Sequence, residues 1–291
     1  MDLRRAAKAR PRTERAVLLL RPVSDALIAV LARRGIHPHA VVLTHAALGV
    51  LAAVLIVIGA SSAASGPPSA WLAAAAALLL KAVLDNVDGG LARVTDRVTP
   101  LGRYLDTGMD LIVTTSLYAA LAPVAGAGLA VAGWLASMAV LSLDHNMERL
   151  YRLPRTPASD RAPEGERGCA APGWAYRVFE GAYRYLLAPQ DRWIERADRA
   201  AFRLAEGASF EAAPRDRRLA WSDLYATATL AELGLTTQTL SLALLLAVGR
   251  PAAFPWLVLG MAAWALATQA ARVPRYRAYR RAHGSGGTDP T

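Results

Sequence analysis

Apolar residues in this chain gather into long runs that are separated by arginine-rich stretches. Each run is about 20 residues long, enough for a helix to cross the hydrocarbon of a bilayer. The runs lack the alternation of strands, and a helix satisfies its own backbone hydrogen bonds in lipid. The pattern predicts an all-α, polytopic membrane protein. Its six transmembrane helices are expected at residues 40–60, 71–94, 101–124, 129–150, 224–248 and 254–271.

Two further segments are amphipathic. Residues 18–34 and 183–204 each set apolar side chains among arginine and aspartate. This composition suits a helix in the membrane interface, and packing on the protein's own cytoplasmic face explains it equally well. Residues 155–172, rich in Pro, Gly and charge, are expected to form a mobile loop. The last residues, 284–291, are expected to be disordered.

The arginines give the expected orientation. They crowd the N-terminal 35 residues, the turn after the second span, residues 150–220 and the C-terminal tail, whereas the connections at 61–70 and 125–128 carry no charge. Positive charge favours the cytoplasmic side, so both termini are expected there. The basic N-terminus is not followed by a short apolar run with a cleavage site, so a removable signal peptide is not expected.

The spans and charged stretches divide the chain into five parts. They are a cytoplasmic N-terminal segment with an interfacial helix (1–35), the first four spans with an aspartate motif (36–150), a cytoplasmic insertion with an amphipathic helix (151–220), the last two spans (221–275) and a partly disordered cytoplasmic tail (276–291).

Composition narrows the setting. The chain has 291 residues, is 54% hydrophobic and carries a formal net charge of +10. Nearly all the positive charge is arginine, a bias typical of a GC-rich bacterial genome, so a bacterial plasma membrane is the expected location. The charge suits anionic lipid headgroups. Nucleic-acid binding is not expected, because no module of basic and aromatic residues is recognisable. The single Cys169 excludes an intrachain disulfide.

Four aspartates stand out in the second and third spans. Asp85 and Asp88 are three residues apart, and Asp106 and Asp110 are four apart, so each pair lies on one helical face. Their charges cost about 10 kcal/mol near a bilayer, at a few kcal/mol each. Lys81, one turn before Asp85, is expected to snorkel or to balance part of that charge, with a substrate contact as the alternative. Bound divalent cations are expected to offset the rest, since an all-oxygen cluster suits Mg²⁺ or Mn²⁺.

The same stretch resembles the signature of the CDP-alcohol phosphotransferase family, D-x-x-D-G-x-x-A-R-x(8)-G-x-x-x-D-x-x-x-D. Every fixed position is present between residues 85 and 110. The resemblance implies two divalent ions, Mg²⁺ or Mn²⁺, with Asp85, Asp88, Asp106 and Asp110 as ligands. It also implies that Asp110 is the catalytic general base.

The resemblance assigns further residues to substrates. Four are expected to form the site of the cytidine diphosphate: Gly89, Ala92, Arg93 and Gly102. Related proteins often carry Pro-Asn/Asp-x-x-Thr at the start of the first span, where this chain has Pro38-His-Ala-Val-Val. Thr44 or His45 is expected to replace the missing polar residue. Three arginines near the ends of the fourth and sixth spans are candidates for an acceptor-phosphate site: Arg149, Arg152 and Arg275.

The expected reaction belongs to phospholipid synthesis. A substituted phosphate moves from a CDP-alcohol to an acceptor alcohol, and CMP is released. The expected donor is CDP-diacylglycerol. In the alternative, a CDP-linked polar headgroup is transferred to diacylglycerol or a polyol. A distant alternative is a cation or solute transporter, which predicts flux without CMP release. The expected partners are donor, acceptor and membrane lipids, and the resemblance implies a homodimer.

Overall fold

The computed structural model describes residues 13–61, 69–155 and 188–283, with residues 173, 177, 178, 181 and 184 between them. Within this part every regular element is helical. Six segments of it are long and apolar enough to cross a membrane: α2 (Pro38–Ser61), α3 (Ser69–Val94), α4 (Pro100–Ala125), α5 (Ala127–Arg152), Arg215–Ala247 and Pro251–His283. The prediction of an all-α chain with six spanning segments is confirmed.

The fifth spanning segment is divided where one continuous helix was expected. It consists of α8 (Arg215–Trp221), α9 (Leu224–Ala231) and α10 (Leu235–Ala247). Gly234 precedes α10 in an extended conformation, and the Glu14 carboxylate accepts the Thr237 backbone N–H at 2.5 Å. A Cβ added at Gly234 would lie 2.8 Å from a Glu14 carboxylate oxygen, so a side chain there would displace that carboxylate. The N-terminal segment therefore caps the broken span.

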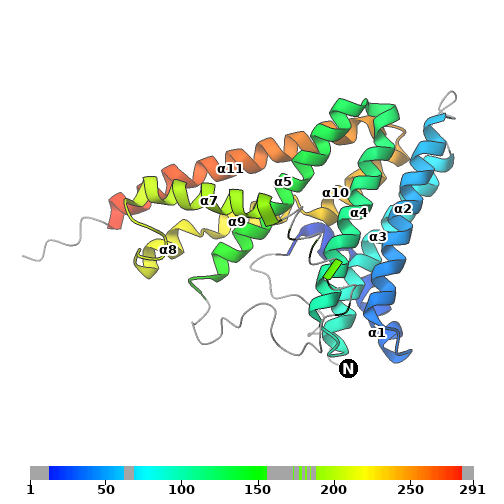
Figure 1. Cartoon of the computed structure of the whole chain (residues 1–291), viewed down its shortest axis with the longest axis horizontal. Helices are drawn as coiled ribbons and strands as arrows, with labels where there is room; N and C mark the ends of the chain where they lie inside the picture. The colour runs from blue at the N-terminus through cyan, green and yellow to red at the C-terminus, as the bar shows by residue number, and fades with distance from the viewer. Residues whose placement is uncertain are drawn as a thin grey trace, which may run out of the picture.

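The sixth segment extends well beyond the expected end at residue 271. A short 3₁₀ turn (Pro251–Ala253) leads into α11 (Phe254–His283), which has 30 residues and a length of about 45 Å. The hydrocarbon of a bilayer is only about 30 Å thick. In Figure 1, α11 leads from the bundle of α2, α3, α4 and α10 to the opposite end of the molecule, and α5, which packs against α11, leaves the bundle at a steeper angle.

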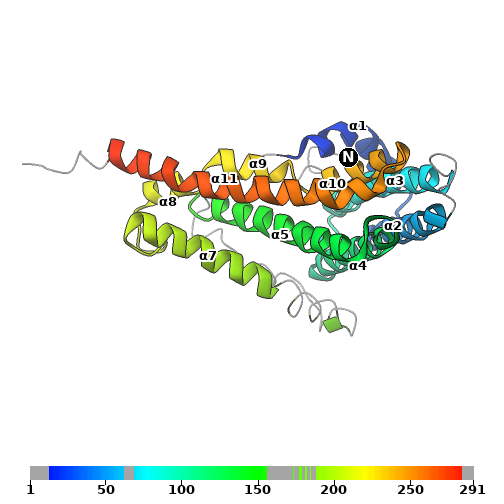
Figure 2. The same ribbon diagram turned by 90° about the horizontal axis from the view of Figure 1, so that it is seen from above.

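That end forms a second lobe around α7 (Ala188–Glu206), which lies beside α5 and α11 (Figure 2). Phe202 of α7 packs against Trp221 and Tyr276. The segment expected to be amphipathic therefore packs on the protein itself through one face. Its opposite face is open, since Trp193 is 69% exposed and Leu204 83% exposed.

The N-terminal helix α1 (Arg15–Arg33) also divides its faces between protein and surroundings. Ile28 is buried against Val87 and Leu91 of α3, whereas Leu19 and Val23 are exposed. The expected mobile loop from residue 156 and the expected disordered tail at 284–291 lie outside the described residues.

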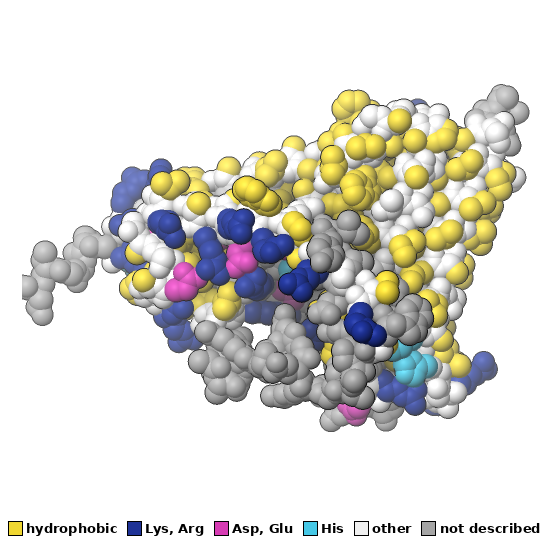
Figure 3. Space-filling view, in the orientation of Figure 1, with side chains coloured by type: hydrophobic (Ala, Val, Ile, Leu, Met, Phe, Trp, Pro, Cys, Tyr) yellow, Lys and Arg dark blue, Asp and Glu magenta, His cyan; other side chains and the backbone are white. Residues whose placement is uncertain are grey.

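Side-chain types are segregated over the surface. On the face in Figure 3, hydrophobic side chains dominate the upper and right-hand parts, over the spanning helices, and arginines gather over the lobe that contains α7. This separation suits a bundle in lipid joined to a lobe at the basic, headgroup side.

Candidate functional site

The turn between α3 and α4 sets the direction of the two aspartate-bearing helices. Asp96 adopts φ 53°, a left-handed conformation that Asp tolerates better than most residues. The Arg97 backbone N–H then donates to the Ala92 carbonyl at 2.8 Å, which closes the end of α3. Thr99 begins α4 by accepting the Gly102 backbone N–H on its hydroxyl at 3.0 Å. The chain thus reverses within a few residues.

Helix α2 lies between the two aspartate helices. Both α3 and α4 pack far more against α2 than against each other. The approach of α2 to α4 is close, since a Cβ added at Gly49 would lie 2.4 Å from Val113 Cγ1. Side chains of α2 can therefore reach the space between the two aspartate pairs.

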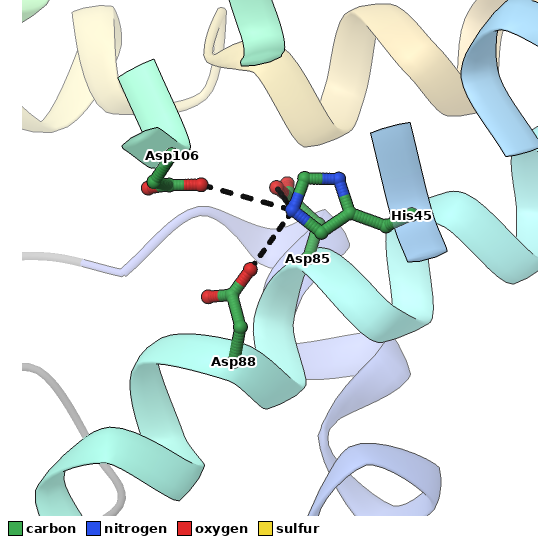
Figure 4. Close-up of side chains that lie close together, drawn as sticks. All are labelled: His45, Asp85, Asp88 and Asp106. Carbon is green, nitrogen blue, oxygen red and sulfur yellow. Dashed lines mark ion pairs between the residues drawn. The ribbon is translucent and has the colours of Figure 1, made fainter. Parts of the chain in front are cut away.

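His45 of α2 occupies that space (Figure 4). Its Nε2 atom lies 2.9 Å from Asp88 Oδ2, and 3.8 Å from both Asp85 Oδ1 and Asp106 Oδ1. Ligand atoms of these four residues all lie within 4.8 Å of one another. The structure thus brings three of the four predicted aspartates to one point and adds an imidazole to them.

Several buried polar atoms at this point make no hydrogen bond of ordinary geometry among the described residues, although His45 Nε2 and Asp88 Oδ2 form an ion pair at 2.9 Å. They are both ring nitrogens of His45, Asp88 Oδ2 and Asp106 Oδ1. The His45 side chain is fully buried at 0% exposure. Buried polar atoms are rarely left without hydrogen bonds, and a divalent cation satisfies carboxylate oxygens and an imidazole nitrogen together. The residues present therefore fit a bound metal ion.

Asp110 lies apart from this group and pairs with Lys81. The Lys81 Nζ atom is 2.8 Å from Asp110 Oδ1 and 3.5 Å from Asp85 Oδ1. Its side chain is only 1% exposed. Asp85 therefore lies beside both the His45 group and the buried ammonium. The site consists of two adjoining centres that share this one carboxylate.

The residues expected around the cytidine diphosphate lie between Asp88 and Asp106 in the sequence. A Cβ added at Gly89 would lie 3.2 Å from Arg93 Nη1, so the guanidinium folds back over the glycine. A Cβ at Gly102 would lie 3.0 Å from His39 Nε2. Gly102 thus allows the start of α4 to approach the start of α2, as expected from its small size. Ala92 lies between Gly89 and Arg93 on the last turns of α3.

The three arginines proposed for an acceptor site are engaged elsewhere. Each pairs with a different carboxylate: Arg149 with Glu195 at 3.1 Å, Arg152 with Glu148 at 2.6 Å and Arg275 with Asp223 at 3.1 Å. The first contact joins α5 to α7, the second lies within α5, and the third joins α11 to Asp223 at the start of α9 (Leu224–Ala231). An acceptor role for the three arginines stays a prediction.

Two members of the cluster have no place in the aspartate pattern. His45 precedes Asp85 by a whole helix, and sequence spacing alone does not reveal that their side chains meet. The missing Asn or Asp after Pro38 was the available signal, since it pointed to His45 or Thr44 as a substitute. Lys81 was detectable as a charge one turn before Asp85, but its stronger contact is with Asp110.

Comparison with known proteins agrees with the motif. Residues 36–158 match the model of the family described as CDP-alcohol phosphatidyltransferase. A stretch of 47 residues is 51% identical to archaetidylinositol phosphate synthase of Aeropyrum pernix. This match covers 16% of the present chain and 24% of that relative. No solved structure matches the chain.

Proposed function

We propose, from the CDP-alcohol phosphatidyltransferase domain at residues 36–158, that this membrane protein transfers a substituted phosphate from a CDP-alcohol to an acceptor alcohol and releases CMP. The observation that carries the proposal is the convergence of three carboxylates and a buried imidazole between α2, α3 and α4. The matched segment contains all of these residues.

The aspartates bind the ions, of which the family resemblance implies two. Asp85, Asp88 and Asp106 are the ligands that the geometry supports for one ion, and Asp110 adjoins them. Bound Mg²⁺ or Mn²⁺ neutralises the donor diphosphate and the charge that develops on departing CMP. Arg93 is the residue proposed to bind the diphosphate or the base edge, and its planar donor groups lie beside Gly89.

Asp110 accepts the proton of the acceptor hydroxyl in this proposal. The hydroxyl oxygen forms a bond to the distal phosphorus, the bond from that phosphorus to the CMP oxygen breaks, and CMP leaves with the electron pair. Lys81 contacts Asp110 at 2.8 Å and holds the carboxylate in place.

The finer assignment is a phosphatidyltransferase of phospholipid synthesis with CDP-diacylglycerol as donor. The aligned relative is named for archaetidylinositol phosphate, so inositol phosphate belongs among the acceptors to test. The six spanning segments support a multi-pass membrane protein. We place it in the bacterial plasma membrane as a homodimer, with its termini and second lobe at the cytoplasmic side.

The test is CMP release by the purified protein in detergent with Mg²⁺ or Mn²⁺. CDP-diacylglycerol and CDP-linked headgroups are each paired with a panel of polyols, polyol phosphates, amino alcohols and diacylglycerol. We expect one donor and acceptor pair to give metal-dependent CMP release that Asp88→Asn abolishes. Asp25→Asn, on the exterior of α1, is the matched control and should retain activity. Absence of CMP release from every pair contradicts the proposal.

A further inference from the structure

We propose that His45 is a metal ligand, so that one ion is held by three carboxylates and one imidazole and the site prefers Mn²⁺ to Mg²⁺. This inference deepens the proposed function, on which the presence of a metal ion rests. It concerns a residue outside the aspartate motif, contributed by a different helix.

Geometry is the first support. An ion with ligands at about 2.1 Å sets neighbouring ligand atoms about 3.0 Å apart and opposite ones about 4.2 Å apart. The His45 Nε2 atom lies 2.9 Å from an oxygen of Asp88 and 3.8 Å from an oxygen of Asp85 and of Asp106. These separations come close to those of a shared coordination sphere. Figure 4 shows the ring nitrogen directed toward Asp106 and Asp88, with the Asp85 side chain behind the ring.

Burial is the second support. His45 is 0% exposed, its Nδ1 atom has no hydrogen-bond partner among the described residues, and its Nε2 atom faces the Asp88 carboxylate at 2.9 Å without a hydrogen bond of ordinary geometry. A buried imidazole without well-formed hydrogen bonds costs free energy unless something in the site binds it. The facing oxygens of Asp88 and Asp106 likewise make no hydrogen bond of ordinary geometry within the described part of the chain. One cation bound to Nε2 and to both oxygens satisfies all three atoms.

Ligand chemistry then gives the metal preference. Mg²⁺ favours oxygen ligands, whereas first-row transition ions accept imidazole readily. Replacing one oxygen by nitrogen therefore weakens Mg²⁺ relative to Mn²⁺. Helix packing fixes the ring for this task, because Gly49, one turn after His45, holds α2 close to Val113 of α4.

The experiment is Mn²⁺ binding to the full-length protein in detergent, without nucleotide, followed by electron paramagnetic resonance. In the wild type we expect a ¹⁴N hyperfine coupling to bound Mn²⁺ that changes when the protein contains ¹⁵N-labelled histidine. His45→Leu should lose the coupling and bind Mn²⁺ at least about 10-fold more weakly. His145→Leu on α5 is the matched control and should keep both properties. His45→Gln, which retains a polar side chain, should reduce the ratio of Mn²⁺ to Mg²⁺ affinity by about 10-fold.

The competing role for His45 is a positive charge that neutralises the aspartates. In that case bound Mn²⁺ shows no nitrogen coupling, and His45→Leu binds Mn²⁺ more tightly because a repelling charge has gone. Either result overturns the proposal, as does a wild type that binds no Mn²⁺. Metal-dependent CMP release without nitrogen coupling would refute His45 as a metal ligand and would leave the proposed enzymatic function standing. Nitrogen coupling without CMP release from any donor would refute the proposed enzymatic function and would leave His45 as a metal ligand.

Discussion

At the scale of single residues, the pair of Lys81 and Asp110 shows how a spanning helix can hold an ammonium. Lys81 is buried within an apolar helix, yet it contacts carboxylates of both α3 and α4. Removal of one partner from a buried ion pair usually costs about 3–5 kcal/mol, because the other charge stays buried without compensation. Lys81 therefore contributes to both the stability and the alignment of the site.

The pair predicts the outcome of a double-mutant cycle. Asp110→Asn should lower the rate constant of CMP release by about 10²- to 10⁴-fold, the usual contribution of a general base. Lys81→Met should lower it by at least about 10-fold, because Asp110 loses its position. The double variant should be no slower than Asp110→Asn alone, since Lys81 acts through Asp110. Steady-state kinetics at saturating donor measures all three. Additive losses would show that Lys81 acts independently.

At the scale of helices, the approach of α2 to α4 depends on Gly49. The Cβ of any other residue would enter the space of the Val113 side chain. Gly49→Ala should therefore lower the free energy of unfolding by about 1–3 kcal/mol, the usual cost of overpacking. Thermal unfolding in detergent measures the change. Val113→Ala, introduced together with Gly49→Ala, should restore part of the loss.

Gly260 of α11 provides the matched control for this prediction. It lies inside a helix and faces open space, with nothing within 4 Å of an added Cβ. Gly260→Ala should stabilise the helix by up to about 1 kcal/mol, since alanine is the better helix former. Equal effects at Gly49 and Gly260 would show that the contact with Val113 has no energetic role.

The contact of α7 with α5 predicts a pH dependence. Burial raises the pKa of the Glu195 carboxyl, but a hydrogen bond from Arg199 and the charges of Arg149 and Arg199 outweigh it, so the pKa lies below its ordinary value near 4.5. A lowered pKa stabilises the folded state fully above pH 4.5, and this contribution is lost as the pH falls toward the lowered value. The ion pairs of Glu195 with Arg149 and Arg199 are partly exposed, so their contribution to the free energy of unfolding should be at most about 1 kcal/mol.

Thermal unfolding of the wild type and Glu195→Gln checks this dependence. The wild type should be the more stable of the two at pH 6, and the difference should shrink as the pH falls below 4.5. Asp216→Asn is the control, because the exposed Asp216 contacts only its neighbour Arg217 among the ion pairs of the described residues. A difference for Glu195→Gln that is constant with pH would contradict the assignment.

The helices also show which features the sequence could predict. Apolar runs located α2 to α5 within a few residues, because a bilayer imposes a length and a composition that hydropathy records. The break before α10 was missed, and the Glu14 carboxylate that accepts the Thr237 backbone N–H there comes from 223 residues earlier in the chain. The local motif predicted the four aspartates. The position of His45 among them depends on how α2 packs against α3 and α4, which a local motif does not record. The family resemblance grouped Asp110 with the metal ligands, and this role stays a prediction; the motif does not show that the Lys81 ammonium lies 2.8 Å from the Asp110 carboxylate.

At the scale of the whole molecule, the charges and the spans together predict a topology. Arginines dominate the lobe around α7 and the C-terminal end of α11, and the connection between α4 and α5 carries none. Since α5 crosses the membrane once, its N-terminal and C-terminal ends lie on opposite sides. The positive-inside tendency then places the lobe in the cytoplasm and Gly126 outside.

The single cysteine makes this topology measurable. Cys169 follows α5 in the chain and lies outside the described residues, and the next long helix, α7, belongs to the basic lobe. In intact spheroplasts a membrane-impermeant maleimide should leave Cys169 unlabelled, and it should react in inverted vesicles, where the cytoplasmic side faces the reagent. A Cys169→Ala variant that carries Gly128→Cys, at the start of α5, should give the opposite result. Labelling after detergent treatment confirms that each thiol can react. Labelling of Cys169 from outside would reverse the orientation, and it would also move the aspartate cluster away from the side where cytidine nucleotides are available.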